Sequence, residues 1–322
     1  MSYKKALNFV SAGIVMVGMQ LSAQSRGHIA MIAPEIPRPA MMEYNELPIV
    51  NEQPIQPIAD LGNMDLQKIL ESEIEKDPYW KNLVRNNKMA VGIVDLTNPN
   101  EIKYAGINDN TMMYAASLPK IAILLSAMDA FEKGELEETE TIKNDLRLMI
   151  SKSDNHASTR MIDRLGYEKI ESVLRGTDYK LYDEEAGGGL WVGKRYAAGG
   201  RRYPEPLKGL SHAATVKQVC SFYYQLAMGR LVSADRSREM LDIMKDPALH
   251  HKFVNTLEKL APRATLFRKS GSWKNYHSDS VLVWGPKRHY IIVALIDDNL
   301  GENIIRKLVY PLDNVLKNSR TL

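Results

Sequence analysis

Strand-like segments lie at both ends of the folded part of this chain, and a long helical stretch separates them. Residues 89–96 and 102–105 are predicted as two strands around the turn Asn98-Pro99-Asn100. Three further strand segments follow, and their short connections predict antiparallel pairing: 264–269, 280–284 and 290–296. Because the sheet draws strands from both ends of the domain, we expect an α+β enzyme, an α/β sandwich with a five-stranded antiparallel sheet flanked by helices and an inserted all-helical subdomain.

Helical spacing of apolar residues marks the segments between and around these strands. It begins with Leu66, Ile69, Leu70 and Ile74 behind an Asn-Met-Asp start, and continues over 118–175, 214–228, 234–244 and 302–316. Residues 176–212 are rich in glycine and lack a steady period, which favours a long functional loop. We expect the catalytic cleft between the sheet and the helical block.

The first 59 residues differ in character from the rest. Lys4-Lys5, an apolar run from Ala6 to Leu21 and the small residues that end at Ala23 are typical of an export signal, so we expect residues 1–23 to be removed. An uncleaved membrane anchor is the alternative, although the run is short for a span. Residues 24–59 contain six prolines and are predicted as a linker, which leaves 60–322 as the catalytic domain. The mature chain is expected in the periplasm or secreted.

Charge and cysteine content exclude several classes of function. The formal net charge is +3, and removal of Lys4 and Lys5 would leave a nearly neutral chain, so nothing favours a nucleic-acid partner. The single cysteine, Cys220, permits no intramolecular disulfide. We expect a monomer without a stable membrane span after cleavage of the signal.

Three short motifs occur in order along the predicted domain. Ser117-Leu118-Pro119-Lys120 is an S-x-x-K sequence, Ser153-Asp154-Asn155 is S-D-N, and Lys269-Ser270-Gly271 is K-[S/T]-G. S-x-x-K alone carries little information, because it arises by chance roughly once in a chain of this length. All three in this order are rare by chance, which favours a common catalytic role.

The first motif combines a nucleophile with a base. A spacing of three places Ser117 and Lys120 on one face of the helix that they are predicted to open. A serine hydroxyl is a weak nucleophile until a base accepts its proton, and a lysine can do so when burial and a second cation, here Lys269, lower its pKa. The Ser117 N–H at a helix start is free to stabilise an oxyanion. The alternative is that Ser117 only caps the helix.

These motifs resemble those of the penicillin-recognising serine enzymes, the class A β-lactamases and the related D,D-peptidases, over roughly residues 62–317. The resemblance implies a β-lactamase/transpeptidase-like fold in which Ser117 attacks a carbonyl, Lys120 accepts its proton and Ser153 relays a proton to the leaving nitrogen. It also implies a substrate-binding set: Asn155 for an amide side chain, Lys269 and Ser270 for a carboxylate, and the strand residues Gly271 and Ser272, whose Ser272 N–H is the second oxyanion donor.

The sequence departs from class A β-lactamases at the glutamate that activates the deacylating water. Their Glu-Pro-x-x-x-Asn type of loop is not intact here. Glu185, in Tyr182-Asp183-Glu184-Glu185, is our candidate because of its position along the chain, and Glu205, followed by Pro206, is the second. An exposed acidic turn is the alternative. Trp191 and Tyr196 of the same loop are expected to line the cleft or to pack the loop.

No cofactor is expected. Residues 188–194 match most of a P-loop, but Arg195 stands where Ser or Thr would bind Mg²⁺ and no apolar strand precedes them. The histidines do not show metal-binding spacing.

The expected substrate is a small-molecule or peptidoglycan-like acyl compound. The leading interpretation is hydrolysis of β-lactam amides through an acyl-serine intermediate. A D,D-peptidase or another cell-wall or ester hydrolase on the same scaffold is the alternative, and a non-catalytic module that binds cell-wall fragments is the second.

Overall fold

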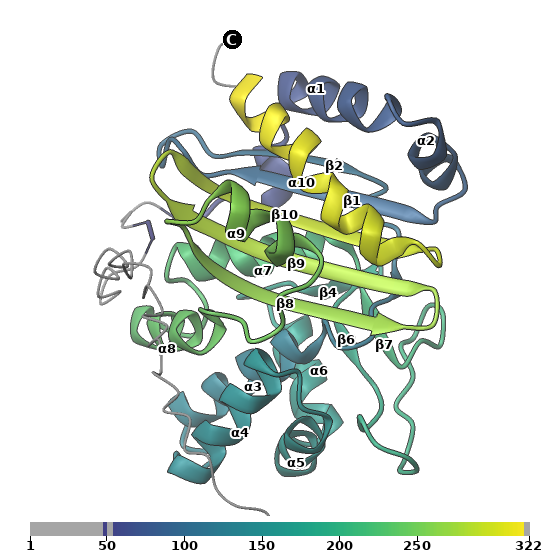
Figure 1. The fold of residues 1–322 in the computed structure, drawn as a ribbon. Helices are drawn as coiled ribbons and strands as arrows, with labels where there is room; N and C mark the ends of the chain where they lie inside the picture. The colour runs from purple at the N-terminus through teal and green to yellow at the C-terminus, as the bar shows by residue number, and fades with distance from the viewer. Residues whose placement is uncertain (1–47, 50–53, 319–322) are drawn as a thin grey trace, which may run out of the picture. The chain divides into compact units, whose positions relative to one another are not determined.

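The computed structural model describes residues 48–49 and 54–318 (Figure 1). Contacts divide the chain into two units, 1–41 and 42–322, and the description concerns the second. The expected signal at 1–23 and most of the expected linker at 24–59 lie outside the described residues. Ile49 is buried, and its N–H donates to the Ala227 carbonyl at 3.1 Å.

The predicted five-stranded antiparallel sheet is confirmed. Its strand order is β2-β1-β10-β9-β8, so the strands from the two ends of the domain meet where β1 pairs with β10. In β8 and β9, Lys269 lies opposite Ser280 and Gly271 opposite Ser278. The strand bounds are β1 Met89–Asp95, β2 Lys103–Ile107, β8 Thr265–Trp273, β9 Tyr276–Gly285 and β10 Arg288–Asp297.

Helices cover both faces of this sheet. Successive strand residues point to opposite faces, and in β1 the residues on both faces are buried. On one face, Val91 and Ile93 pack with α1 (Met64–Glu75), α2 (Pro78–Arg85), α9 (Phe253–Leu260) and α10 (Gly301–Asn318). On the other face, Ala90 and Val94 belong to the core that includes α7 (Val216–Ala227) and the helical block. A Cβ on Gly92 would lie 2.4 Å from Val216 Cγ1, so this glycine permits the close approach of α7 to β1.

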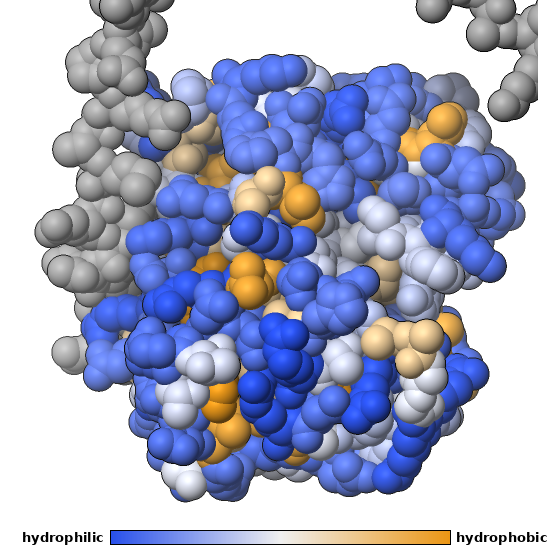
Figure 2. Space-filling view, turned by 60° about the horizontal axis from the view of Figure 1, so that its bottom comes forward, coloured by the Kyte–Doolittle hydropathy of each residue, from blue (hydrophilic) through white to orange (hydrophobic). Residues whose placement is uncertain are grey.

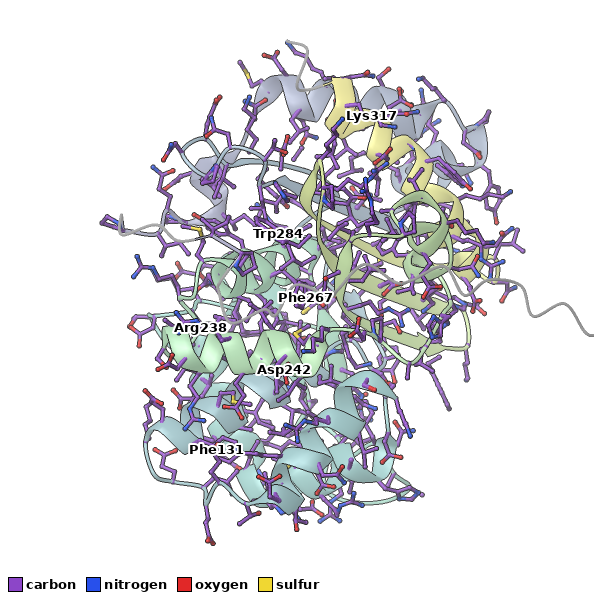
Figure 3. The ribbon with its side chains drawn as sticks, turned by 60° about the vertical axis from the view of Figure 1, so that its left-hand side comes forward. Phe131, Arg238, Asp242, Phe267, Trp284 and Lys317 are labelled. Carbon is purple, nitrogen blue, oxygen red and sulfur yellow. The ribbon has the colours of Figure 1, made fainter. Side chains whose placement is uncertain are left out.

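The predicted helical block is confirmed and consists of four helices. They are α3 (Lys120–Glu132), α4 (Glu140–Ser151), α5 (Asn155–Leu165) and α6 (Tyr167–Arg175), and α8 (Ala234–Met244) contacts both α4 and β8. Figure 3 shows Phe131 among the helices of the block, with Arg238 and Asp242 on α8 between them and the sheet. Nearly every residue of α3 is buried, so the helix that follows Ser117 is a central support of the domain.

Two helices were not predicted. Helix α2 has clear signals, with Asp77 as N-cap and Pro78 at its first position. Helix α9 has no such signal: Lys252 precedes it with a φ of 55° and makes no side-chain cap, and the Phe253 N–H donates to the Asp279 carboxylate on β9 instead. A cap supplied from a distant strand cannot be recognised from local sequence.

The loop expected over 176–212 contains short strands. Strand β4 (Tyr182–Asp183) pairs with β5 (Gly188–Gly189), and β6 (Trp191–Val192) and β3 (Met113–Tyr114) flank β7 (His212–Ala214). This small sheet attaches the loop to the segment immediately before Ser117.

The helices of the described segments 48–49 and 54–318 do not combine the length and apolar character needed to cross a membrane. Figure 2 shows a mainly hydrophilic face with small, separate hydrophobic groups.

Candidate active site

Ser117 lies in the turn between β3 and α3. The structure corrects the expectation that Ser117 opens the helix: α3 begins at Lys120, and the turn before it closes by a hydrogen bond from the Leu118 N–H to the Ala115 carbonyl at 3.0 Å. Ala116 has a φ of 51°, a left-handed conformation that is unfavourable for alanine and is typical of functional turns. Among the described residues, neither the Ser117 N–H nor its hydroxyl has a hydrogen-bond partner, so both are available to a substrate.

The backbone of β8 lies directly against this turn. A Cβ on Gly271 would lie 2.3 Å from the Ala115 carbonyl oxygen and 2.5 Å from the Ser117 nitrogen. Only a residue without a side chain permits this approach, which explains the glycine of the third motif. The motif at 269–271 and Ser117 of the first motif therefore lie side by side.

Lys120 is fully buried, and its amine is surrounded by oxygen atoms of the second motif. Its Nζ donates to the Ser153 carbonyl at 2.7 Å and to Asn155 Oδ1 at 2.9 Å, and lies 3.4 Å from Ser153 Oγ. Burial lowers the pKa of Lys120 to about 7, although the Asp154 carboxylate opposes the shift. A substantial fraction of this amine is thus neutral near pH 7 and able to accept a proton.

Ser153 owes its position to an unusual backbone conformation. Its φ of 57° is left-handed, and the turn directs both its carbonyl and its hydroxyl to Lys120. Asp154, the next residue, caps α5 by accepting from the Ala157 N–H at 2.6 Å, which is a structural role.

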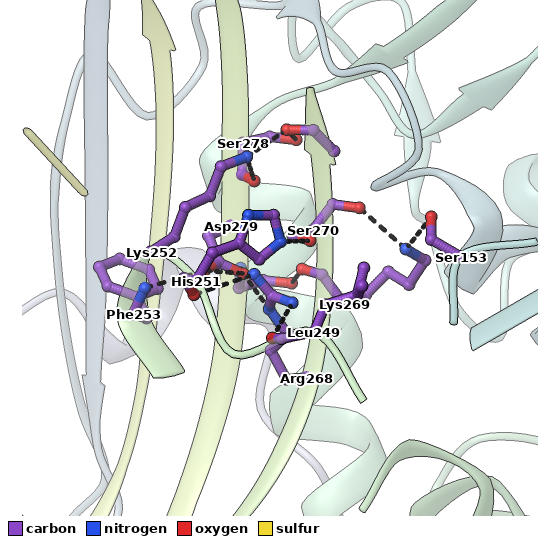
Figure 4. A network of polar contacts seen from close by, with 12 residues as sticks. Ser153, Leu249, His251, Lys252, Phe253, Arg268, Lys269, Ser270, Ser278 and Asp279 are labelled. Carbon is purple, nitrogen blue, oxygen red and sulfur yellow. Dashed lines mark hydrogen bonds and ion pairs between the residues drawn. The ribbon is translucent and has the colours of Figure 1, made fainter. Parts of the chain in front are cut away.

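Lys269 completes the group from the opposite side (Figure 4). Its side chain is only 1% exposed, and its Nζ donates to Ser153 Oγ at 2.9 Å and to the Ser270 carbonyl at 2.8 Å. Burial, together with the nearby charges of Lys120 and Arg268, lowers the pKa of Lys269 well below its usual value. The Ser153 hydroxyl therefore lies between two lysine amines, one from α3 and one from β8.

A buried polar network supports β8 behind the site (Figure 4). Arg268 and Asp279 form an ion pair at 2.6 Å, and Asp279 also accepts from the Phe253 N–H at 3.1 Å. Lys252 Nζ donates to Ser272 Oγ at 2.8 Å and to the Gly271 and Ser278 carbonyls at 2.5 and 3.0 Å. Lys252 thus holds the strand segment that faces Ser117, and burial lowers its pKa to about 8.

Ser270 and Ser272 have different surroundings. The Ser270 side chain is buried, with its Oγ 3.4 Å from His251 Nε2, whereas Ser272 is exposed at the open end of the strand. His251 Nδ1 lies 3.7 Å from the Glu302 carboxylate at the start of α10.

The loop at 176–212 contributes an aromatic side chain to the site. The Tyr196 ring lies over Lys120, with Nζ 4.4 Å from the ring centroid, and its hydroxyl donates to the Ala116 carbonyl at 3.2 Å. His212 packs against Tyr196 with 4.3 Å between ring centroids, and burial lowers the pKa of His212 to about 4. Trp191 instead packs the loop, where its indole N–H donates to the Tyr203 carbonyl.

The two candidate glutamates lie apart from these contacts. Glu185 is exposed in the turn between β4 and β5, and among the described contacts it touches neither Ser117 nor Lys120. Glu205 is buried, but it accepts hydrogen bonds from the Tyr182 hydroxyl and from the N–H groups of Leu207 and Lys208. The structure therefore brings together Ser117, Lys120, Ser153, Asn155, Lys269 and Gly271, but it does not add either glutamate to them.

Sequence reasoning missed Lys252, Arg268 and Asp279. A lone lysine after two histidines gives no indication that its amine will hold a strand twenty residues later in the chain. Among the described residues, no group of three His, Cys, Asp or Glu side chains could hold a metal ion.

The fold and this cluster define a class of active-site-serine enzymes. The chain belongs to the beta-lactamase enzyme family, whose sequence model matches residues 77–145 and 141–310. It is therefore a serine β-lactamase-like hydrolase at the level of the family. No curated protein matches the chain.

Solved structures show the same fold at low sequence identity. The beta-lactamase from Sphaerobacter thermophilus DSM 20745 is 15% identical, with a TM-score of 0.59, and the match covers 77% of this chain and 95% of that one. PBP-A is 19% identical, with a TM-score of 0.58 and 81% and 98% covered. TLA-3 extended-spectrum beta-lactamase is 14% identical, with a TM-score of 0.60 and 78% and 99% covered.

Proposed function

We propose that this chain is an exported enzyme that opens β-lactam amides through an acyl intermediate on Ser117. The observation that carries the proposal is the convergence of Lys120 and Lys269 on Ser153, because both amines lie within hydrogen-bond distance of its hydroxyl. The family match and the lowered pKa of Lys120 support the same reading.

The acylation step assigns a role to each group. Neutral Lys120 accepts the Ser117 proton as the Oγ–carbon bond forms, and the N–H groups of Ser117 and Ser272 stabilise the oxyanion. The carbon–nitrogen bond then breaks, Ser153 donates its proton to the nitrogen, and the protonated Lys120 restores it. Asn155 orients the substrate's amide side chain, while Lys269 and Ser270 bind its carboxylate. Hydrolysis of the ester requires a water molecule and a base. Glu185, the base expected from the sequence, is exposed and contacts neither Ser117 nor Lys120 among the described contacts.

A D,D-peptidase is the second candidate, because no carboxylate of the described residues contacts Lys120. A solved mutant of PBP-A is an acyl-enzyme complex with penicillin-G; it is 18% identical over 81% of this chain and 98% of that one, with a TM-score of 0.59. Slow release of an acyl group would be consistent with this candidate.

The test is to incubate the mature chain with a fluorescent penicillin and, separately, with a chromogenic cephalosporin. We expect a covalent adduct that peptide mass mapping locates at Ser117 and that Ser117→Ala abolishes. Ser126→Ala is a matched control, because Ser126 is buried on α3 and its hydroxyl donates to the Ala122 carbonyl. The absence of any adduct in the folded wild-type chain would overturn the proposal in favour of a binding module. Steady cephalosporin turnover would favour a β-lactamase over a peptidase.

The acylation rate should rise with pH through about 7. Burial lowers the pKa of Lys120 to about 7, and only its neutral form can accept the Ser117 proton, so the rate is lost as the pH falls below this value. The measurement is the saturating rate constant for penicillin labelling, from two units below to two units above that pH. Loss of the Lys269 proton as the pH rises should instead weaken substrate binding. A saturating rate constant that stays flat across this range would contradict Lys120 as the base.

A further inference from the structure

Tyr196, from the loop at 176–212, contacts both Lys120 and the residue before Ser117. Its ring lies 4.4 Å from Lys120 Nζ, and its hydroxyl donates to the carbonyl of Ala116, the residue immediately before Ser117. The hydroxyl proton is thus engaged with the backbone, and burial raises the pKa of the phenol well above its usual value. Tyr196 therefore presents a neutral aromatic surface to the amine and offers no base to a water molecule.

Hydrogen bonds on both sides of Tyr196 fix this part of the loop. His212 Nε2 lies 3.0 Å from the Lys194 carbonyl, the Gly193 N–H donates to the Ser211 carbonyl at 2.7 Å, and the Tyr203 N–H donates to the Gly193 carbonyl at 2.7 Å. The His212 ring then supports the tyrosine ring from behind. The Tyr196 ring over Lys120 is therefore held in place by its neighbours in the loop and by His212.

The carboxylates of this loop are all engaged or exposed elsewhere. Glu205 is held in a buried turn, Glu184 pairs with Arg175 at 2.6 Å, and Asp183 accepts from the Glu185 N–H. Asp178 and Glu185 are exposed. The oxygen atoms that surround Lys120 Nζ belong to Ser153, Asp154 and Asn155, and none of them is a carboxylate oxygen.

Hydrolysis of an acyl-serine needs room for a water molecule and a group that accepts its proton. The water oxygen must bond to the acyl carbon while its proton passes to a base, and the carbon–Oγ bond then breaks as Ser117 recovers a proton. Glutamate, aspartate or histidine commonly accepts such a proton. On the loop side of Lys120, the space beside the amine is occupied by the Tyr196 ring.

We propose that Tyr196 shields the Ser117 ester from water and thereby makes the acyl-enzyme of this chain long-lived. This inference rests on the proposed acylation of Ser117 and identifies Tyr196 as the residue that sets the rate of the second step. The acyl-enzyme then persists long after the substrate has bound, as in a peptidase that retains a bound acyl group. Rapid turnover of β-lactams is therefore not expected.

The experiment measures release of a fluorescent penicillin from pulse-labelled enzyme after removal of free label. Tyr196→Gly removes the ring, and we expect release about 10-fold faster than in the wild type, since water gains access. Tyr196→Glu introduces a carboxylate beside Lys120, and we expect about a 100-fold increase, within the range of general-base catalysis. Tyr196→Phe keeps the ring and should release label within about 2-fold of the wild-type rate. Tyr203→Phe, in the same loop but packed on Tyr167, is the control for general loosening.

The outcomes separate this inference from the proposed function. If the wild-type chain acquires no label at Ser117, the proposed function fails. If Ser117 is labelled but Tyr196→Gly and Tyr196→Glu release label at the wild-type rate, Tyr196 does not shield the ester. Immediate loss of label from the wild type would also overturn the inference while leaving acylation intact. A variant that becomes labelled at Ser117 has kept its fold. If either Tyr196→Gly or Tyr196→Glu fails to fold, the other variant serves as the test.

Discussion

Replacing Lys120 with methionine should lower the rate of Ser117 acylation about 1000-fold. Removal of a general base typically costs about 10²- to 10⁴-fold in rate. Methionine has a similar length and leaves no charge in the fully buried position. The measurement is the saturating rate constant for penicillin labelling, together with the melting temperature.

Lys133→Met is the matched control for this substitution. Lys133 follows the same helix, pairs with Asp129 at 3.0 Å and has a side chain that is 56% exposed, so its loss should leave labelling unchanged. The Lys120 variant should also lose the rise in rate through pH 7. A Lys120→Met enzyme that labels within about 3-fold of the wild type would mean that another group accepts the proton.

The positions of the side chains that we propose as catalytic were largely predictable from the motifs. Ser117, Ser153 and Lys269 are separated by long stretches of chain, yet each has a structural reason for its position: a turn before a buried helix, a left-handed residue before an Asp cap, and a strand next to a glycine. Each of these local structures can be recognised from neighbouring residues in the sequence. The five strands were predictable for the same reason, because their apolar runs are bounded by turns.

The surroundings of these side chains were not predictable in the same way. Lys252 acts on β8 from a loop before α9, and its three acceptors include two backbone carbonyls, which have no sequence signature. Tyr196 belongs to a loop without periodicity, so the sequence could indicate only that it lines the cleft or packs the loop. The contact with Lys120 depends on how β6 and β7 attach the loop to β3.

These surroundings bear directly on the choice between hydrolase and peptidase. In our proposal, the acylating groups come from motifs that the sequence displays, whereas the rate of acyl release depends on the side chain that faces Lys120 from the loop. An acidic residue at the right distance along the chain, such as Glu185, is insufficient evidence for the second step. The loop side chain that contacts the amine is Tyr196, which lies 41 residues after Asn155, the nearest residue of the three motifs.

Gly271→Ala should lower the acylation rate about 100-fold even though it adds a single methyl group. The new Cβ would lie 2.3 Å from the Ala115 carbonyl oxygen and 2.5 Å from the Ser117 nitrogen. Both are backbone atoms, so no flexible side chain can move aside. Strand β8 and the Ser117 turn must then separate, and a displacement of about 1 Å can cost about 10²-fold in rate.

Gly62→Ala provides the comparison, because a Cβ there would lie 3.5 Å from its nearest neighbour, the Ala59 carbonyl, which is an ordinary contact. That variant should acylate normally. Overpacking at Gly271 should also destabilise the fold by about 1–3 kcal/mol, measured as a lower melting temperature. The two effects can be separated by temperature: if the loss of acylation persists well below the melting transition, it results from altered geometry at Ser117. Normal labelling of a folded Gly271→Ala enzyme would show that the close approach of β8 to the nucleophile is not needed for acylation.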